Sequence, residues 1–270
     1  MAAKKRRSNP NAKVEGESAA AKAAPAGSRL SGKFAVVTGG NRGIGLAIAR
    51  ALVAEGCSVL ITGRDRAALK NAKAELTSIA SGISPQPEVH AARCEVQKPA
   101  SVSSVFTKVK KRWGHLDILI SNAGISQAKF SVEDTPVELW RSVIDINLTG
   151  TFLVSRASVP LMARGATIVN TLSIAAKMNF VQFSAYNASK HGALGFTLTL
   201  REELIPKGIR VVALMPGATD TDIWEQFWPD APRQKMVQPE SIAEAVLYAV
   251  LLPPAANLSE LVLVPLEGVL

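Results

Sequence analysis

The sequence predicts a doubly wound α/β fold, in which helices cover both faces of one parallel β-sheet. Short, almost continuously apolar runs alternate with segments of helical periodicity along the chain, as expected for parallel strands that are buried on both faces. A glycine-rich turn follows the first apolar run directly, at a place where such sheets bind ligands. The 270 residues, of which 47% are hydrophobic, are enough to bury one large core. A second domain is not needed.

The expected elements follow one another in the order of such a fold. The first strand is expected at residues 34–38 and is followed by a helical pattern over 44–55. A second strand at residues 59–62 is followed by an amphipathic segment over 66–81. Helical patterns fill the later gaps, the longest around residues 137–163 and 185–205. The other expected strands cover residues 89–92, 116–121, 167–171, 210–214 and 261–264.

The start of the chain differs in composition from the rest. Basic residues are concentrated there, large apolar residues are scarce, and the whole chain carries a net charge of +9. Such a segment cannot bury a core, so we expect residues 1–31 to form a disordered, basic and alanine-rich tail and residues 32–270 to form the domain. The tail could be a solubilising extension, or it could bind nucleic acid or direct nuclear import. No apolar segment follows the basic start, so a secretory signal is not expected.

Several classes of protein are disfavoured by the composition. Two cysteines, Cys57 and Cys94, are too few for a disulfide framework and are expected to be buried thiols in a reducing compartment. None of the three histidines pairs with Cys or another His at metal-ligand spacing, so no metal is expected. There is no run of about 18 apolar residues, so no membrane span is expected. These features predict a cytoplasmic protein.

The turn after the first strand has the chemistry of a dinucleotide site. Glycines permit a tight turn and let backbone N–H groups approach a pyrophosphate. The helix that begins near Gly43 directs its positive end at the same place. The turn lies between an expected strand and an expected helix, which is the context that this motif requires. Its residues are Thr38-Gly39-Gly40-Asn41-Arg42-Gly43-Ile44-Gly45.

Two arginines favour NADP(H) over NAD(H) as the cofactor. A site for NAD would carry an acidic residue at the end of the second strand to bind the ribose hydroxyls, whereas residues 61–65 read ITGRD. Arg64 in this segment and Arg42 in the glycine turn suit the 2′-phosphate of NADP, which an acid would repel. The alternative is that both are ordinary surface arginines. Asp65 could also neutralise part of the charge of Arg64 or bind the ribose.

Tyr186 and Lys190 are four residues apart in an expected helix and therefore lie on one of its faces. A nearby ammonium stabilises a phenolate and would lower the pKa of the tyrosine from its usual value of about 10. Such a phenol can donate a proton to a carbonyl oxygen or take one from an alcohol. This pair alone is common in helices without any function, so it needs support from other motifs.

That support comes from further motifs in register along the chain. They are Ser121-Asn122-Ala123-Gly124, Asn147-Leu148-Thr149-Gly150, Ser173 and Pro216-Gly217, together with the glycine turn and the Tyr186/Lys190 pair. With them, the chain from residue 32 to about residue 222 resembles the short-chain dehydrogenase/reductase family. The spacing from Ser173 to Tyr186 (186 − 173 = 13) is the usual one in that family. The resemblance implies a single Rossmann domain with seven parallel strands in the order 3-2-1-4-5-6-7 and helices on both faces.

The resemblance also implies a role for each matching residue. Tyr186 would donate and accept the proton, Ser173 would orient the substrate carbonyl, and Lys190 would bind the nicotinamide ribose. Asn147 would position a water in a proton relay that ends at Lys190. The residues expected to contact the cofactor are Gly39, Asn41, Arg42, Gly43, Ile44, Gly45, Arg64, Glu95, Val96, Asn122, Ala123, Gly124, Tyr186, Lys190, Pro216, Gly217, Thr219 and Thr221.

The chain departs from the family pattern at several places. Ser121 stands where the family usually has Asn, and Glu95 stands where Asp is common, so the placement of the adenine could differ. The C-terminal segment lacks the usual glycine-rich ending, which argues mildly against a ketoacyl-carrier-protein reductase.

The substrate side is expected at a lid over residues 219–237. Aromatic residues of this lid, with others after Ser173, could form an apolar pocket over the nicotinamide. Alternatively, the lid aromatics only pack within a short amphipathic helix. The candidate substrate-binding residues are Met178, Phe180, Phe183, Trp224, Phe227 and Trp228.

We therefore expect an NADP(H)-dependent carbonyl reductase or alcohol dehydrogenase for a medium-sized, partly apolar substrate. A β-ketoacyl thioester is the alternative substrate, and a cofactor-binding regulator with little turnover is the alternative function. Family resemblance implies a homodimer or homotetramer, formed through the long helices at residues 137–163 and 185–205.

Overall fold

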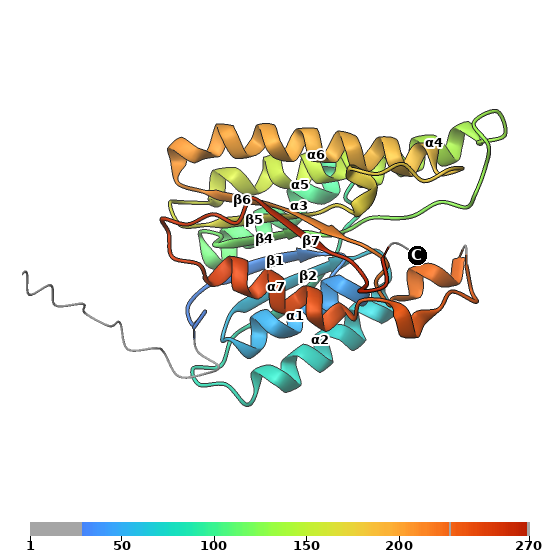
Figure 1. The fold of residues 1–270 in the computed structure, drawn as a ribbon. Helices are drawn as coiled ribbons and strands as arrows, with labels where there is room; N and C mark the ends of the chain where they lie inside the picture. Colours follow the sequence, from blue (N-terminus) through green and yellow to red (C-terminus); the bar gives the residue numbers. More distant parts are fainter. Residues whose placement is uncertain (1–28, 227, 269–270) are drawn as a thin grey trace, which may run out of the picture.

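The computed structural model describes residues 29–226 and 228–268, which are built around one seven-stranded sheet (Figure 1). All strands are parallel, and their order, β3-β2-β1-β4-β5-β6-β7, confirms the predicted fold class. The strands are β1 (Phe34–Thr38), β2 (Ser58–Gly63), β3 (Val89–Arg93), β4 (Ile118–Ser121), β5 (Thr167–Thr171), β6 (Arg210–Pro216) and β7 (Glu260–Leu263).

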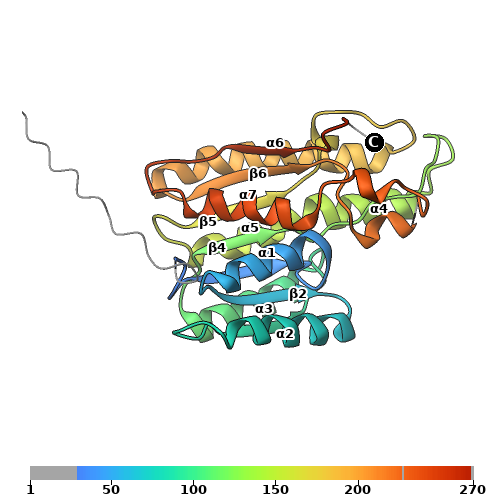
Figure 2. The same cartoon turned by 60° about the horizontal axis from the view of Figure 1, so that its bottom comes forward.

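Helices cover both faces of this sheet (Figures 1 and 2). On one face lie α1 (Gly43–Ala54), α2 (Arg66–Ala80) and α7 (Pro239–Leu251), and on the other lie α3 (Pro99–Trp113), α4 (Val137–Ile144), α5 (Gly150–Ser158) and α6 (Ser184–Leu204). Because successive strand residues point to opposite faces, each strand serves two cores. Val37 belongs to the core that contains Leu52 of α1, and Val36 to the core that contains Val109 of α3. This double burial explains the almost continuously apolar strands.

The segment that was expected to be one helix over residues 137–163 is interrupted. A π-helical turn, Asp145–Thr149, separates α4 from α5, and a 3₁₀ turn, Val159–Leu161, ends the segment. The interruption contains Asn147, whose side chain forms hydrogen bonds with the backbone of Ile125 in the loop after β4. Short π-helical turns inside α-helices often occur at functional sites. The apolar periodicity gave no sign of this turn because it continues through both helices.

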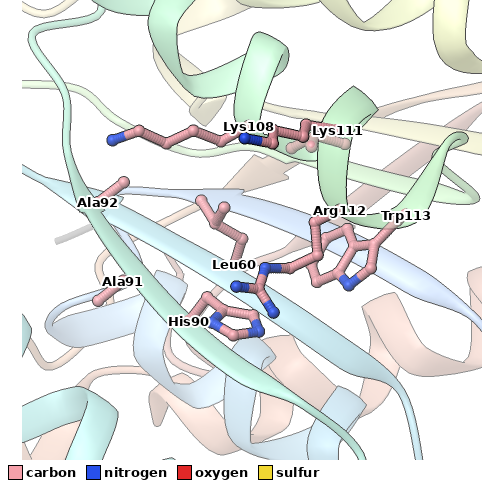
Figure 3. A pocket seen from close by; sticks show the side chains of 9 residues that line it. Leu60, His90, Ala91, Ala92, Lys108, Lys111, Arg112 and Trp113 are labelled. Carbon is pink, nitrogen blue, oxygen red and sulfur yellow. The ribbon is translucent and has the colours of Figure 1, made fainter.

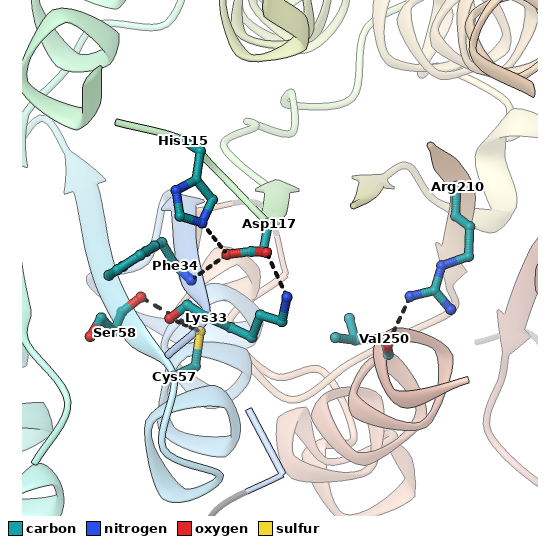
Figure 4. Close-up of polar contacts among 8 residues, drawn as sticks. All are labelled: Lys33, Phe34, Cys57, Ser58, His115, Asp117, Arg210 and Val250. Atoms are coloured by element: carbon teal, nitrogen blue, oxygen red, sulfur yellow. Dashed lines mark hydrogen bonds and ion pairs between the residues drawn. The ribbon is translucent and has the colours of Figure 1, made fainter. Parts of the chain in front are cut away.

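Polar contacts join neighbouring segments at the end of the sheet where the strands begin (Figure 4). The carboxylate of Asp117 accepts hydrogen bonds from the backbone N–H of Phe34 (3.0 Å) and from Lys33 Nζ (2.9 Å). Across the sheet, Arg210 at the start of β6 donates to the carbonyl of Val250 in α7 (2.9 Å). The predicted site residues lie at the opposite end of the sheet, where the strands end.

The residues just before residue 32 contact the folded domain. Leu30 is 5% exposed and belongs to the core beneath α1, and its backbone N–H donates to the carbonyl of Glu55 (2.8 Å). Arg29 forms an ion pair with the same Glu55. The rest of the expected tail, residues 1–28, lies outside the described residues. Among the helices described, none has the length and apolar character needed to cross a membrane.

Candidate active site

The glycine turn joins the end of β1 to the start of α1 and is packed too tightly for side chains. A Cβ atom on Gly45 would lie 2.3 Å from the carbonyl oxygen of Gly39. Gly39 itself has φ +63°, a left-handed conformation that favours glycine. Arg42 occupies the N-cap position of α1 without a side-chain cap. The backbone N–H groups of the first turn, which include those of Gly43, Ile44 and Gly45, therefore form a positive end suited to a pyrophosphate.

Thr38 and Asn122 lock this turn to the loop after β4. The Thr38 hydroxyl oxygen accepts from the backbone N–H groups of Asn122 (2.9 Å) and Ala123 (3.0 Å). The Asn122 side chain donates to the backbone carbonyls of Thr38 (3.2 Å) and Gly39 (3.4 Å). These bonds explain why Asn122 occurs in the motif, because its side chain holds the two loops together. Gly124, two residues further on, lies next to Lys190. Thr38 is a site residue whose individual role the sequence did not indicate.

The candidate 2′-phosphate ligands lie at the ends of β1 and β2. Arg42 and Arg64 are both exposed, and neither forms an ion pair with another residue of the described chain. Asp65 is the N-cap of α2 and accepts from the backbone N–H groups of Ala67 (2.8 Å) and Ala68 (3.1 Å). One oxygen of its carboxylate thus caps the helix, and Asp65 forms no ion pair with Arg64 in the described chain. Asn41 lies beside Gly63, where an added Cβ would approach the Asn41 side-chain oxygen to 2.4 Å.

Glu95 and Val96 follow β3. Glu95 forms ion pairs with Arg93 (2.9 Å) and Lys98 (2.7 Å). The hydrogen bond from Lys98 is the main reason that the pKa of Glu95 is lowered. Val96 is buried and packs against Gly150 at the start of α5, where an added Cβ would lie 2.8 Å from a Val96 methyl group.

Asn147 lies in the π-helical turn and is 2% exposed. Its side-chain oxygen accepts from the backbone N–H of Ile125 (2.8 Å), and its Nδ2 donates to the Ile125 carbonyl (2.9 Å) and to Ser189 Oγ (3.1 Å). A Cβ on Gly124 would approach both the Asn147 side-chain oxygen (3.2 Å) and Lys190 Nζ (3.7 Å). Gly124 therefore lets the asparagine and the lysine come close together.

Ser173, which follows β5, meets Tyr186 and Lys190 in the first two turns of α6. Ser173 caps the 3₁₀ turn Ile174–Ala176 and is hydrogen-bonded to the Tyr186 side chain. Lys190 is 6% exposed, its Nζ lies 5.5 Å from the centre of the Tyr186 ring, and it donates to the Thr171 carbonyl (3.4 Å). The structure thus brings together the side chains that the sequence named as catalytic.

The electrostatics of this pair differ from the expectation. Burial raises the pKa of the Tyr186 phenol above its usual value, and the hydrogen bond with Ser173 opposes this shift. The Tyr186 pKa is therefore raised, and the expected net lowering is wrong for this structure. Burial lowers the pKa of Lys190 itself to about 8, because its ammonium group is separated from water.

The segment after β6 covers the glycine turn. Pro216 ends β6, and a Cβ atom on Gly217 would lie 3.1 Å from Pro265 and 3.2 Å from Val264, closer than an ordinary contact. Thr219 is buried, and Thr221 lies against Gly43, with a methyl group 3.1 Å from an added Cβ there.

The candidate substrate residues fall into two groups. Met178 is exposed, Phe180 is half-buried, and the Phe183 ring lies 6.5 Å from that of Tyr186. In the lid, Trp224 donates to the Thr219 carbonyl (2.8 Å) and packs on the small core of Ala218, Ala231 and Met236. Trp228 lies 5.9 Å from Trp224 and is 38% exposed, while Phe227 lies outside the described residues.

Two further residues support the site without any signal in the sequence. Gln127 is 3% exposed and accepts from the backbone N–H of Tyr186 (2.8 Å). Thr171 supplies the carbonyl that binds Lys190.

A hollow of about 530 Å³ lies elsewhere, between the edge strand β3 and α3 (Figure 3). His90, Lys108 and Trp113 are among its lining residues, and none of the predicted site residues is. Within residues 29–226 and 228–268, no three His, Cys, Asp or Glu side chains gather in a way that could hold a metal.

Comparison with known proteins gives a consistent result. A model of the family described as short chain dehydrogenase matches residues 33–232. An uncharacterised oxidoreductase of Staphylococcus aureus is 33% identical over 238 residues, which are 87% of this chain and 98% of the relative.

Two solved structures resemble the chain over 87% of its length and 97% of theirs. One is a short-chain dehydrogenase of Burkholderia cenocepacia in complex with NADP, with 31% identity and a TM-score of 0.78. The other is a variant of the actinorhodin polyketide ketoreductase with NADPH, with 31% identity and a TM-score of 0.75.

Proposed function

The chain belongs to the short-chain dehydrogenase family of oxidoreductases, and we propose that it is an NADP(H)-dependent member that interconverts a carbonyl group and a secondary alcohol. The observation that carries this proposal is the joint placement of Ser173, Tyr186 and Lys190. The Ser173 hydroxyl, the Tyr186 phenol and the buried Lys190 amine lie together beside the loop after β4, which is hydrogen-bonded to the glycine turn.

The residues of the turn fit a dinucleotide. Gly39, Gly43 and Gly45 leave a cradle that a Cβ would fill, next to the uncapped first turn of α1. Arg42 and Arg64 are exposed cations without partners in the described chain, and a 2′-phosphate would give both of them an anionic ligand. Solved relatives that contain NADP or NADPH support the same choice. We therefore propose a preference for NADP(H) over NAD(H).

The chemistry divides between the cofactor and the chain. When bound, the nicotinamide supplies a hydride to the carbonyl carbon, or accepts it from the alcohol. In reduction, the Tyr186 hydroxyl donates its proton to the carbonyl oxygen, so that an alcohol forms and a phenolate is left. Ser173 donates a hydrogen bond to the same oxygen and stabilises the negative charge that develops there. Alcohol oxidation runs through these steps in reverse.

Lys190 and Asn147 restore the proton of Tyr186. Protonated Lys190 stabilises the phenolate. Burial lowers the pKa of Lys190 to about 8, so its ammonium group can give up a proton near neutral pH. Asn147 is hydrogen-bonded to Ile125 and lies beside Gly124, and it therefore holds the loop next to Lys190 in place. A water between Lys190 and solvent completes the proposed relay.

The substrate proposed is a medium-sized, partly apolar ketone, aldehyde or alcohol. Phe183 beside Tyr186 and the exposed side chains of Met178 and Trp228 provide apolar surface on that side of the site. The likeness to a polyketide ketoreductase supports a β-ketoacyl thioester as a second candidate. A regulator with little turnover would not need an intact proton path, and this chain has every group of it.

The oligomeric state is also a proposal. Trp140 of α4, Phe152 of α5 and Leu198 of α6 expose 41%, 42% and 37% of their surfaces. Three large apolar side chains on one helical layer suit a contact with a second copy, as a homodimer or within a homotetramer.

The test is an assay of NADPH oxidation against a panel of apolar ketones, aldehydes and thioesters, for the wild type and Tyr186→Phe. Removal of the proton donor should cost about a hundredfold or more in kcat, with NADPH binding retained. A wild type that binds NADPH but reduces nothing in the panel, or a phenylalanine variant that is equally active, would overturn the proposed mechanism. Preference for small charged hydroxy acids over every apolar ketone would overturn the proposed substrate class.

A further inference from the structure

We propose that Gln127 is a positioning residue, which caps the catalytic helix α6 from a separate segment and thereby fixes Tyr186 against Ser173. The inference rests on the proposed function for its consequence in catalysis, whereas the contact itself can be tested without turnover. Gln127 is five residues beyond Asn122, in the loop after β4. None of the motifs in the sequence includes it.

The start of α6 needs an external cap. The first N–H groups of a helix have no partner within the helix and are usually bound by a side chain at the N-cap. Phe183 occupies that position in α6 and offers no side-chain cap. The side-chain oxygen of Gln127 accepts from the backbone N–H of Tyr186 at 2.8 Å instead. Because Gln127 is 3% exposed, water cannot easily replace this bond.

The other end of the Gln127 amide holds the segment that precedes α6. Its Nε2 donates to the carbonyl oxygens of Gln182 (3.2 Å) and Ala128 (3.3 Å). The backbone N–H of Phe130 donates to the same Gln182 carbonyl (3.1 Å). Gln182 has φ +67° and is the one non-glycine residue of the described chain with a positive φ, a conformation that costs free energy for such a residue. These two donors stabilise the turn that leads into α6.

One buried amide thus joins three segments at the catalytic tyrosine. It connects the loop after β4, the segment that carries Phe180 and Phe183, and the first turn of α6. Ser173 reaches Tyr186 from a different element, at the end of β5. The hydrogen bond between them depends on the position of the first turn of α6. Loss of the cap would release that turn, weaken the bond to Ser173 and so raise the pKa of Tyr186 further.

Three variants separate this role from general stability. Gln127→Met keeps a similar volume and removes all three hydrogen bonds. Gln127→Glu keeps an oxygen that can accept from Tyr186 N–H. Thr197→Val is the matched control, because it removes two buried hydrogen bonds of the same helix, one from Asn170 (3.0 Å) and one to the Ala193 carbonyl (2.7 Å), and leaves the contacts of Gln127 in place.

Two measurements are made on the full chain. The first is hydrogen exchange of the Tyr186 amide in the protein alone, where Gln127→Met should lose about tenfold in protection, as for loss of a helix cap. The second is the pH profile of alcohol oxidation, for which Tyr186 must be a phenolate. In Gln127→Met, kcat should fall by about tenfold or more from misplacement of the phenol, and the rising limb should move to higher pH. Gln127→Glu should recover the protection only at the acidic end of the pH range, because its ionised carboxylate cannot donate to the carbonyl oxygens of Gln182 and Ala128.

The outcomes distinguish the two hypotheses. Unchanged protection of the Tyr186 amide in Gln127→Met would overturn the cap, whether or not the protein turns over. A fall in kcat without movement of the pH limb, matched by Thr197→Val, would show loss of stability alone and would overturn the positioning role. A wild type without turnover would overturn the proposed function, while the exchange measurement would still decide the contact.

Discussion

Asn147 and Ile125 form a two-point hydrogen-bonded pair, in which one side-chain amide satisfies both the N–H (2.8 Å) and the C=O (2.9 Å) of one backbone residue. The pair joins the π-helical turn between α4 and α5 to the loop after β4. It explains why a helix is interrupted at this place. A regular helix would present Asn147, which is 2% exposed, differently, and the backbone of Ile125 would lose its partner.

The first prediction concerns this pair. Asn147→Ala should lower the free energy of unfolding by about 2 kcal/mol or more, because it leaves both backbone groups of Ile125 without a partner. Denaturation by urea measures this. Asn187→Ala is the control, since Asn187 makes the same two-point contact with Phe180 (2.8 and 3.4 Å) but is only half-buried. An equal or larger loss in the control would contradict the importance of burial.

The second prediction concerns the glycine turn. Gly45→Ala would place a Cβ 2.3 Å from the carbonyl oxygen of Gly39, so the start of α1 must move away from β1. We expect NADPH binding to weaken by at least about tenfold, because the N–H groups that face the pyrophosphate move with it. Calorimetric titration measures the change. Gly82→Ala, where the nearest atom lies at 3.6 Å, should bind NADPH like the wild type, and similar binding by both variants would refute the cradle.

The third prediction concerns cofactor choice. In an Arg42→Ala/Arg64→Ala double variant, NADPH binding should weaken by about a hundredfold or more, since charge-assisted hydrogen bonds are each worth about 1.5–3 kcal/mol. NADH binding should change little, because NADH has no 2′-phosphate. Lys70→Ala, an exposed cation on α2, controls for net charge. Equal losses for NADPH and NADH, or a wild type that prefers NADH, would show that the two arginines do not select the cofactor.

The fourth prediction concerns pH. Carbonyl reduction needs protonated Tyr186, whose pKa is raised, and a charged Lys190, whose pKa burial lowers to about 8. The value of kcat/KM should therefore be level below pH 8 and fall above it as Lys190 loses its proton. A profile that stays level to about pH 10, the usual range of lysine, would contradict this assignment.

The stability of the protein should move in the opposite direction over the same range. Lys190 has a lower pKa in the folded chain, about 8, than in the unfolded chain, about 10.4. Between these values the unfolded chain binds more protons, so the contribution of Lys190 to the free energy of unfolding rises with pH. Wild type should therefore gain stability relative to Lys190→Met between pH 8 and pH 10. No relative gain would show that the charged form is not penalised in the fold.

Much of the fold was predictable because its signals are local. The apolar runs that became β1, β2 and β5 were found within one residue of their bounds, since burial on both faces makes such strands mostly apolar. The glycine turn and the Tyr186/Lys190 spacing were equally visible, because a tight turn requires glycine and a helix places residues four apart on one face.

Other features depended on partners far apart in the chain. The π-helical turn is fixed by Ile125, 22 residues before Asn147, and Gln127 meets Tyr186 across 59 residues. The role of Asp65 as the cap of α2 also became visible only in the structure. The raised pKa of Tyr186 came from burial, which no local spacing encodes.

The sequence by itself determined the doubly wound sheet and predicted the dinucleotide turn and the Tyr186/Lys190 pair, because backbone freedom, apolar runs and helical spacing act between near neighbours. Only the tertiary structure decided which groups are buried, which polar atoms pair, and where the long helix breaks. Those properties follow from packing, in which a buried polar group must find its partner wherever the fold brings one within reach.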